Sequence, residues 1–341
     1  MRTARFHETD EPLILEDLPV PHVSLDEVLV RVEACGICHT DLSILEGLLP
    51  PSRRPITLGH EASGTVSEIG EQVKQFDVGE RVIVNCFASR CGLCHHCQSG
   101  RTNLCPDAKI LGLDLDGAFA EYVKVPEQGL VKLPEDIPLR ESAVIADAIS
   151  TPVHSIMTVG HVSPEDVIAI FGIGGLGINA VQIGAAFASE VIAIDLVDWK
   201  LEAAMKLGAT RCVNAAEENS VKELRKMTEG VGVDAAFDFS GTTKAFSDAF
   251  WSVKDGGRVI VTALGLNNLD MSLLPLVRKE ISITGSYGYT EEDVTRAIHL
   301  TQQGHIKLDP TITHMLPLEQ VNDGLELVMK GKTLRAIVLP Q

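Results

Sequence analysis

Four cysteines lie close together in the segment CGLCHHCQSGRTNLC, at residues 91–105 of this 341-residue chain. The spacing C-x2-C-x2-C-x7-C permits disulfides, an iron–sulfur cluster or a zinc ion. Nothing in the chain indicates the oxidising compartment that disulfides need, and the gap of seven residues is longer than in ferredoxin-type clusters. Zinc fits best, and a closed shell of four thiolates leaves no position for substrate, so we expect a structural ion. Its ligands would be Cys91, Cys94, Cys97 and Cys105.

Three other stretches each carry one residue of a kind that binds catalytic zinc. They are Cys38 in ACGICHTD, His60 in LGHEASG and Asp147 in AVIADAIST. Each alone has an ordinary explanation, as a core thiol, a turn residue or a helix cap. Together they supply a sulfur, an imidazole and a carboxylate, and three protein ligands leave the fourth zinc position open for water or substrate oxygen. Glu61 and Asp41 are candidate carboxylates for orienting these ligands.

A glycine motif of the kind that binds dinucleotides follows the strand-like segment VIAIF. In GIGGLG, the residues Gly172, Gly174 and Gly177 match G-x-G-x-x-G and open a helix-like run, and a second strand-like segment ends at Asp195. The glycines would admit a pyrophosphate to the helix N-terminus, and Asp195 would accept hydrogen bonds from the ribose hydroxyls. A carboxylate there repels a 2′-phosphate and no arginine follows it, which favours NAD over NADP.

Two kinds of element must position these residues. Beyond residue 150, strand-like segments such as VDAAFDF and GRVIVTA alternate with helical patterns, which predicts a doubly wound parallel sheet. Before it, short apolar runs joined by glycine and proline turns predict a β-rich domain. We therefore expect an α/β protein with a catalytic domain at 1–150 that includes the zinc lobe, a nucleotide-binding domain at 151–285, and a return to the first domain at 286–341.

Composition narrows the function classes. Acidic residues outnumber basic ones by 47 to 29, and the net charge of −18 argues against nucleic acid and anionic membrane as partners. The uncharged run at 167–189 is long enough to cross a bilayer, but its five glycines, Asn179 and Gln182 favour a buried strand–turn–helix. No apolar run follows the first basic residues, so we expect no signal peptide and a cytoplasmic protein.

With these motifs in order, the chain resembles the zinc-dependent medium-chain alcohol dehydrogenases over essentially its whole length. The likeness rests on CGICHTD, GHEASGTV, the four-cysteine segment, GIGGLG with Asp195, WKLEAAMKLGA, GSYG and LRAIVLP. It implies a GroES-like catalytic domain with a Rossmann domain, two zinc ions per chain, NAD, and a homotetramer or dimer. The implied reaction is reversible hydride transfer between NAD and a primary or secondary alcohol, giving an aldehyde or ketone.

Three alternatives stay open at this point. A polyol, diol or amino-alcohol dehydrogenase of the same superfamily would keep both zinc sites and the NAD site. A zinc-free reductase of the same superfamily is opposed by the three candidate ligands. A binding module that uses the cysteine lobe to recognise nucleic acid or protein is opposed by the charge and by the second ligand set.

The resemblance also assigns roles to residues. Thr40 matches the hydroxyl that hydrogen-bonds the substrate oxygen, and Asp147 stands where many members have cysteine and some bacterial ones aspartate. Ser43 stands where many members have the histidine that ends the proton relay, so the end of the relay stays open. The residues expected to bind the cofactor are His39, Thr151, Gly172, Gly174, Gly175, Leu176, Gly177, Asp195, Lys200, Leu264, Leu266, Ser286, Tyr287 and Arg335. Those expected at the substrate pocket are Phe87 and Leu113.

Overall fold

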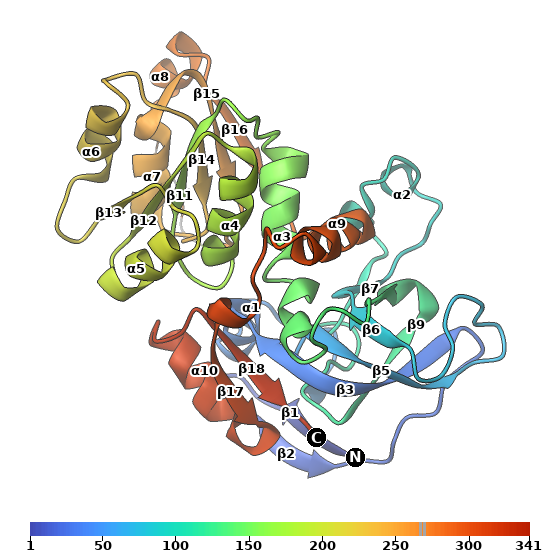
Figure 1. Cartoon of the computed structure of the whole chain (residues 1–341). Coiled ribbons are helices and arrows are strands. Elements are labelled where there is room, and N and C mark those ends of the chain that lie inside the picture. Colours follow the sequence, from blue (N-terminus) through green and yellow to red (C-terminus); the bar gives the residue numbers. More distant parts are fainter. Residues whose placement is uncertain (266–267, 269–270) are drawn as a thin grey trace. The chain divides into compact units, whose positions relative to one another are not determined.

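A computed structural model describes residues 1–265, 268 and 271–341 (Figure 1). The chain divides into two compact units, one formed by Met1–Ser150 with Tyr289–Gln341 and the other by Thr151–Gly288. The chain thus leaves the second unit after Gly288, rather than after residue 285 as expected from the sequence. Each unit has its own sheet and core, and each is described separately.

The second unit is built on a six-stranded sheet in the order β13-β12-β11-β14-β15-β16, with every pair parallel. This is the predicted doubly wound arrangement, and the central strands β11, β12 and β14 are mostly buried because helices cover both faces of the sheet. The strands are β11 (Val167–Phe171), β12 (Glu190–Asp195), β13 (Arg211–Asn214), β14 (Val233–Asp238), β15 (Val253–Val261) and β16 (Ser282–Gly285). The helical segments are α3 (Ser150–Val153), η4 (His154–Val159), α4 (Gly177–Phe187), α5 (Asp198–Lys206), α6 (Ser220–Met227), α7 (Thr243–Ser252) and α8 (Leu273–Arg278).

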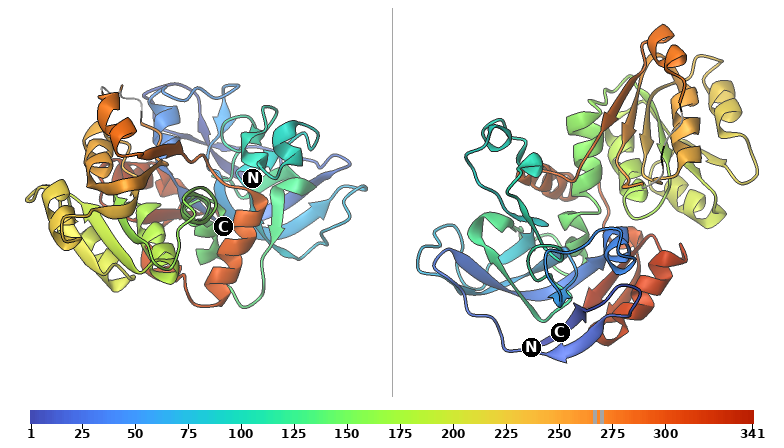
Figure 2. Two further views of the ribbon diagram at one scale, coloured as in Figure 1. Left: turned by 90° about the horizontal axis from the view of Figure 1, so that it is seen from above. Right: turned by 180° about the vertical axis from the view of Figure 1, so that it is seen from behind.

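Four of the helices in this unit pack in two pairs, α4 with α5 and α6 with α7 (Figure 2). The first pair follows β11 and β12, and the second follows β13 and β14. The core between the sheet and α6 and α7 includes Phe171, Ile192, Phe246 and Phe250, all buried. The run at 167–189 is therefore a strand, a turn and a helix, as predicted. Among the described residues, no helix is long and apolar enough to cross a membrane.

The first unit is β-rich, as predicted. Its main sheet has the order β10-β6-β5-β3-β18-β17 with β9 also on β3, and β2-β1-β4 and β7-β8 form smaller sheets. The strands are β1 (Arg2–Phe6), β2 (Ile14–Asp17), β3 (Glu27–Ile37), β4 (Ile56–Thr57), β5 (Glu61–Ile69), β6 (Arg81–Val84), β7 (Phe87–Ser89), β8 (Lys109–Ile110), β9 (Tyr122–Pro126), β10 (Leu130–Lys132), β17 (Ile312–Pro317) and β18 (Arg335–Leu339). The helical segments are α1 (His39–Leu45), α2 (His95–Gln98), α9 (Glu291–Gln302), α10 (Val321–Met329), η1 (Thr102–Leu104), η2 (Glu127–Gly129), η3 (Glu141–Ala146), η5 (Asp309–Thr311) and η6 (Leu318–Gln320).

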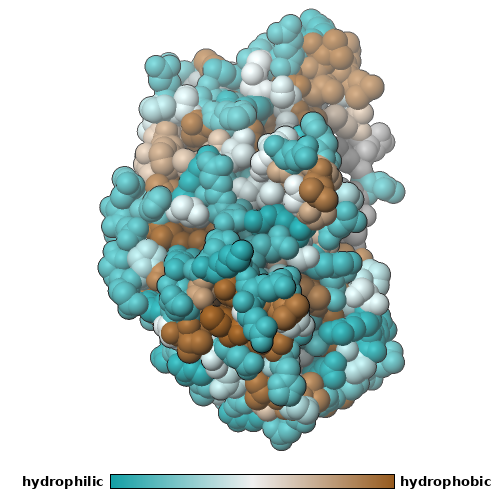
Figure 3. Space-filling view, turned by 90° about the vertical axis from the view of Figure 1, so that its right-hand side faces the viewer, coloured by the Kyte–Doolittle hydropathy of each residue, from teal (hydrophilic) through white to brown (hydrophobic). Residues whose placement is uncertain are grey.

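The end of the chain completes this sheet. Strand β18 pairs antiparallel with β3, with Ile337 opposite Gly36, and parallel with β17. Residues from both parts of the unit share one core, in which Ile37, Val30 and Val338 are fully or almost fully buried. On the face of the molecule drawn in Figure 3, hydrophilic residues predominate and hydrophobic ones gather in separate patches.

Candidate metal centres and nucleotide site

Cys38 lies where strand β3 passes into helix α1, and it is 8% exposed. It caps the helix N-terminus, and its backbone N–H donates a hydrogen bond of 2.9 Å to Asp41 Oδ2 in the first helical turn. An acidic side chain three residues after the cap satisfies a free N–H of the helix end and favours helix formation there. The sulfur is thus held by local structure that the segment CGICHTD itself encodes.

His60 lies just before strand β5, and the pairing of β5 with β3 brings it close to Cys38. Strands β3 and β5 pair antiparallel with Gly36 opposite Glu61, so the residues that follow and precede these two come close together. The ring of His60 is 6% exposed, with Nδ1 3.6 Å from Asp41 Oδ1 and Nε2 3.9 Å from Asp147 Oδ2. Asp41 therefore orients the imidazole so that Nε2 faces the other candidate ligands.

Asp147 follows η3 and completes the set from a distant part of the chain. Ser63 of β5 donates a hydrogen bond of 2.6 Å to Leu139 O, which ties the segment before η3 to the sheet. Asp147 is 9% exposed and its Oδ2 lies 3.5 Å from Cys38 Sγ. The ligand atoms of Cys38, His60 and Asp147 all lie within 4.8 Å of one another.

These distances fit one tetrahedral zinc ion. Zinc bonds of about 2.3 Å to sulfur and about 2.1 Å to nitrogen or oxygen place a sulfur and an oxygen ligand about 3.6 Å apart, and a nitrogen and an oxygen about 3.4 Å apart. The observed separations are 3.5 Å for Cys38 with Asp147 and 3.9 Å for His60 with Asp147. Three such ligands leave one corner of the tetrahedron for water or substrate.

A buried ion pair lies beside the three candidate zinc ligands, and several buried groups here have shifted pKa values. Glu61 and Arg335 are almost fully buried, with Arg335 Nη1 3.3 Å from Glu61 Oε2 and donating to Ile37 O at 2.9 Å. Burial raises the pKa of Glu61 to about 8, against the lowering effect of the Arg335 charge. Burial opposes protonation of His60, but Asp41 and Cys38 raise its pKa well above the usual value. Such neighbours favour a cation among these groups.

Glycine at position 36 is required for this pair to fit. A Cβ at Gly36 would lie 2.4 Å from Glu61 Cδ, directly across the β3–β5 register. Real Cβ atoms do not approach other heavy atoms so closely, so only glycine leaves room for the buried carboxylate.

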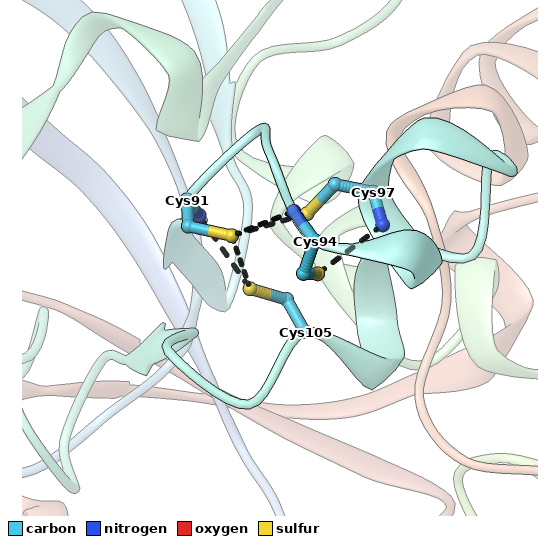
Figure 4. A group of neighbouring side chains, drawn as sticks. All are labelled: Cys91, Cys94, Cys97 and Cys105. Atoms are coloured by element: carbon cyan, nitrogen blue, oxygen red, sulfur yellow. Dashed lines mark hydrogen bonds between the residues drawn. The ribbon is translucent and has the colours of Figure 1, made fainter.

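The four-cysteine segment folds around a common point (Figure 4). Cys105 Sγ lies 3.6 Å and Cys97 Sγ 4.0 Å from Cys91 Sγ, near the separation of about 3.8 Å that four sulfurs around one zinc ion require. Backbone N–H groups of Cys94 and Cys97 donate to the sulfurs of Cys91 and Cys94 at 3.3 Å and 3.5 Å. Such bonds stabilise thiolates, and those from Leu93 and Cys94 lower the pKa of Cys91 to about 7.

The glycine loop of the second unit has the form that a dinucleotide site needs. Gly172 has a φ of +89°, and a Cβ there would lie 2.9 Å from Ser240 N. A Cβ at Gly177 would lie 1.9 Å from Gly172 O, which fixes the close packing of the loop on α4, whereas nothing lies within 4 Å of a Cβ at Gly174. A side chain at position 174 would thus project into open space beside the start of the helix, where a phosphate would bind.

Asp195 ends strand β12, and its carboxylate is held by backbone donors. Ile173 N donates to Oδ2 at 2.6 Å, and Leu196 N and Val197 N donate to Oδ1 at 2.8 Å and 3.1 Å. The acidic side chain and the glycine loop are therefore joined directly by the hydrogen bond from Ile173. In Rossmann folds that bind dinucleotides, an acidic side chain at this place accepts hydrogen bonds from the ribose, and for Asp195 that role stays a prediction.

The remaining predicted residues fall into two groups. In the first unit, Thr40 Oγ1 lies 3.7 Å from Cys38 Sγ, Phe87 is buried, and Leu113 packs against the core. In the second unit, Thr151 and Ser286 are buried, and Ser286 Oγ has no hydrogen-bond partner among the described residues. Exposed or half-buried predicted residues are His39, Gly175, Leu176, Lys200, Leu264 and Tyr287, while Leu266 lies outside the described residues. Their roles toward the cofactor stay predictions.

Sequence reasoning missed one residue next to the ligand set. Tyr289 is 1% exposed, accepts a hydrogen bond of 3.0 Å from Cys86 N, and packs edge-on against Phe87 with ring centroids 5.8 Å apart. Burial, together with the nearby charge of Asp147, raises the pKa of Cys86 to about 12. Tyr289 adjoins the motif GSYG, but nothing in that motif predicts a contact with residue 86.

Comparison with known proteins shows the family to which the chain is similar. Residues 24–135 match the model of the alcohol dehydrogenase GroES-like domain, and residues 175–303 match that of the zinc-binding dehydrogenases. The chain is 34% identical to an alcohol dehydrogenase of Geobacillus stearothermophilus over 99% of each chain. It is also 34% identical to a sorbitol dehydrogenase of Bacillus subtilis, over 100% of this chain and 97% of the relative. The crystal structure of an alcohol dehydrogenase from Aeropyrum pernix superposes with a TM-score of 0.92 at 32% identity, covering both chains completely.

Proposed function

The chain belongs to the zinc-dependent medium-chain dehydrogenase/reductase family, and on this premise we propose that it is an NAD-dependent alcohol dehydrogenase. The proposed reaction removes a hydride from the carbinol carbon and a proton from the hydroxyl of a primary or secondary alcohol. The hydride goes to the nicotinamide ring of NAD⁺, and the product is an aldehyde or ketone. The reverse reaction consumes NADH.

One observation carries this proposal: three ligands of different chemistry meet at one point in the first unit. Cys38, His60 and Asp147 come from three separate parts of the chain and have the spacing of an open zinc site. A zinc ion held there would supply a Lewis acid that makes an alcohol hydroxyl acidic at neutral pH. The four-cysteine site has no open corner and would hold a second, structural ion.

The chain's own side chains would orient the ligands and handle the proton. Asp41 binds the Cys38 backbone and faces His60 Nδ1, which leaves Nε2 for the ion. The Thr40 hydroxyl, 3.7 Å from Cys38 Sγ, would accept the hydroxyl proton of an alcohol and pass its own proton on. Ser43 offers no imidazole at the position expected for the end of a relay, so the proton would leave through a hydroxyl group or water.

The second unit would supply the cofactor site. The glycine loop leaves open space at Gly174 for the pyrophosphate, and the carboxylate of Asp195 would accept hydrogen bonds from the adenosine ribose. The negative charge at this position favours NAD over NADP, because it would repel a 2′-phosphate.

A direct test is a set of oxidation assays monitored at 340 nm with NAD⁺ and a panel of primary, secondary and polyhydric alcohols, alongside metal analysis. We expect about two zinc ions per chain. The variant Cys38→Ser should lose one ion and essentially all activity with little change in thermal stability. Full turnover by this variant, or by a chain without zinc, would disprove the mechanism.

The same panel of alcohols distinguishes the second candidate function, a polyol or diol dehydrogenase, from the first. The sorbitol dehydrogenase relative is as similar as the alcohol dehydrogenase relative, which supports a polyol or diol as an alternative substrate. The predicted pocket residues Phe87 and Leu113 are apolar and favour a hydrophobic alcohol. A higher kcat/KM for polyols than for simple secondary alcohols would establish the alternative.

Self-association into a tetramer or dimer is also part of the proposal. Strand β16 ends the sheet of the second unit, and all four of its residues are exposed, so among the described residues no further strand pairs with its outer edge. Beside it in the chain, helix α8 exposes Leu273, Leu274 and Val277, which are 63–71% accessible. Light scattering of Leu274→Glu with Val277→Glu should show a smaller assembly than the unaltered chain. Met329→Glu, at an equally exposed apolar position on α10, is the control.

A further inference from the structure

Two amide side chains are buried in helix α4, which is otherwise almost entirely apolar. Asn179 is 0% and Gln182 3% exposed in the sequence GINAVQIGAAF. A buried amide costs free energy unless its groups are hydrogen-bonded, and asparagine is a weaker helix former than alanine or leucine. An apolar side chain would therefore serve helix packing better, which points to a different role for Asn179.

The hydrogen bonds of Asn179 show where this role lies. Its Nδ2 donates to the carbonyl oxygen of Gly175, four residues earlier, at 3.0 Å. Its Oδ1 accepts from Gln182 Nε2 at 3.1 Å, so the amide is held in a single orientation with the NH₂ group toward the loop. Gly175 is one of the glycines of GIGGLG, so a buried side chain inside the helix anchors the backbone of the loop.

Anchoring that carbonyl fixes the direction of a neighbouring N–H. A peptide unit is planar and trans, so the carbonyl of Gly175 and the N–H of Leu176 point in opposite directions. Ile178 N and Ala180 N bind the carbonyls of Gly174 and Leu176 at 3.0 Å and 2.9 Å, so the carbonyls of this turn point along the helix. The Asn179 amide holds the Gly175 carbonyl in the same direction, and the Leu176 N–H then points outward from the helix N-terminus.

We propose that Asn179 is a positioning residue for dinucleotide binding, which orients the Gly175–Leu176 peptide so that its N–H can donate to the cofactor pyrophosphate. The inference rests on the proposed function, because it needs NAD to bind at this loop. Asn179 itself touches no ligand in this account. Its contribution is the fixed orientation of a donor that would otherwise have to be ordered on binding.

A matched pair of variants tests this. In Asn179→Ser the hydroxyl can donate to the carbonyl four residues earlier, whereas Asn179→Ala has a side chain of nearly the same size and no donor. Both variants remove the Oδ1 atom that accepts the hydrogen bond from Gln182 Nε2. The comparison between them therefore reports the hydrogen bond to the Gly175 carbonyl oxygen. Using the full-length, zinc-loaded protein, we expect the Kd for NADH to rise about fivefold to tenfold in Asn179→Ala and to stay within about twofold in Asn179→Ser.

Two further measurements separate positioning from a purely structural effect. The Kd for ADP-ribose, which has the pyrophosphate but no nicotinamide, should change by the same factor as that for NADH. The KM for NAD⁺ should rise in Asn179→Ala while kcat at saturating NAD⁺ stays unchanged, and thermal unfolding of both variants controls for stability. Equal affinities of the two variants, or unaltered affinity in Asn179→Ala, would overturn the inference and leave the proposed function intact. Absence of NADH binding by the unaltered chain would overturn both.

Discussion

Replacing Asp195 by asparagine should weaken the preference of this protein for NAD over NADP. The carboxylate accepts hydrogen bonds from Ile173 N on one oxygen and from Leu196 N and Val197 N on the other. Asparagine has one oxygen and one NH₂ group, so it can serve only one of these two sides. Its best orientation keeps the two bonds from residues 196 and 197 and places an NH₂ group against Ile173 N–H, which costs about 1–3 kcal/mol.

The effect on each cofactor follows from charge. Hydrogen bonds from ribose hydroxyls to a carboxylate contribute about 1.5–3 kcal/mol, and bonds to a neutral amide about 1 kcal/mol, so binding of NAD⁺ should weaken about tenfold or more. For NADP⁺ the substitution also removes repulsion. Two charges about 5 Å apart in water repel by about 0.8 kcal/mol, and a doubly charged phosphate doubles this to about 1.6 kcal/mol, or about fifteenfold.

The assay is the ratio of kcat/KM for NAD⁺ to kcat/KM for NADP⁺, because damage to the loop affects both cofactors and cancels in the ratio. We expect the ratio to fall about a hundredfold in Asp195→Asn. The control is Asp198→Asn, which removes the same charge from an exposed position in the first turn of α5. If the unaltered protein used NADP⁺ as well as NAD⁺, or if both variants changed the ratio equally, the assignment of Asp195 would be wrong.

Three further predictions concern stability and metal content. Gly36→Ala should lower the free energy of unfolding by about 1–3 kcal/mol and reduce activity, because its Cβ would lie 2.4 Å from the Glu61 carboxyl carbon. The measurement is thermal unfolding, and the control is Gly285→Ala, whose Cβ would meet nothing within 4 Å. Burial opposes ionisation of the Asp166 carboxyl group, but hydrogen bonds and the charge of Arg258 lower its pKa below the ordinary value. The stabilisation that the ionised Asp166 gives the folded state is therefore present above the ordinary pKa of about 4, and it is lost as the pH falls through the lower pKa of the folded state. Arg258→Met should therefore destabilise by about 1 kcal/mol at neutral pH, and a difference in melting temperature that does not shrink below about pH 4 would contradict this. Removal of metal by a chelator should abolish activity and also lower the melting temperature, because the segment 91–105 contributes few buried side chains of its own; an unchanged melting temperature after loss of both ions would contradict a structural role for the cysteine site.

The sequence by itself determined the features whose parts are close in the chain. The spacing of four cysteines within residues 91–105 predicts a zinc site because a short loop can bring all four sulfurs to one point. The glycine motif with Asp195 predicts a strand, a turn and a helix because its parts lie within one βαβ unit, and the structure has β11, α4 and β12 there. The alternation of strands and helices after residue 150 likewise predicts the parallel sheet.

Only the tertiary structure decided how distant residues meet. Cys38 and His60 approach one another because the register of β3 on β5 places Gly36 opposite Glu61, and no spacing in the chain specifies a register between strands. Tyr289 lies against Cys86 because the chain returns to the first unit after residue 288. The burial of the Arg335–Glu61 pair, which the sequence motifs alone did not predict, depends on β18 pairing with β3. Strand register and packing are set by the sum of many weak contacts across the whole core, so they emerge only when the chain is folded.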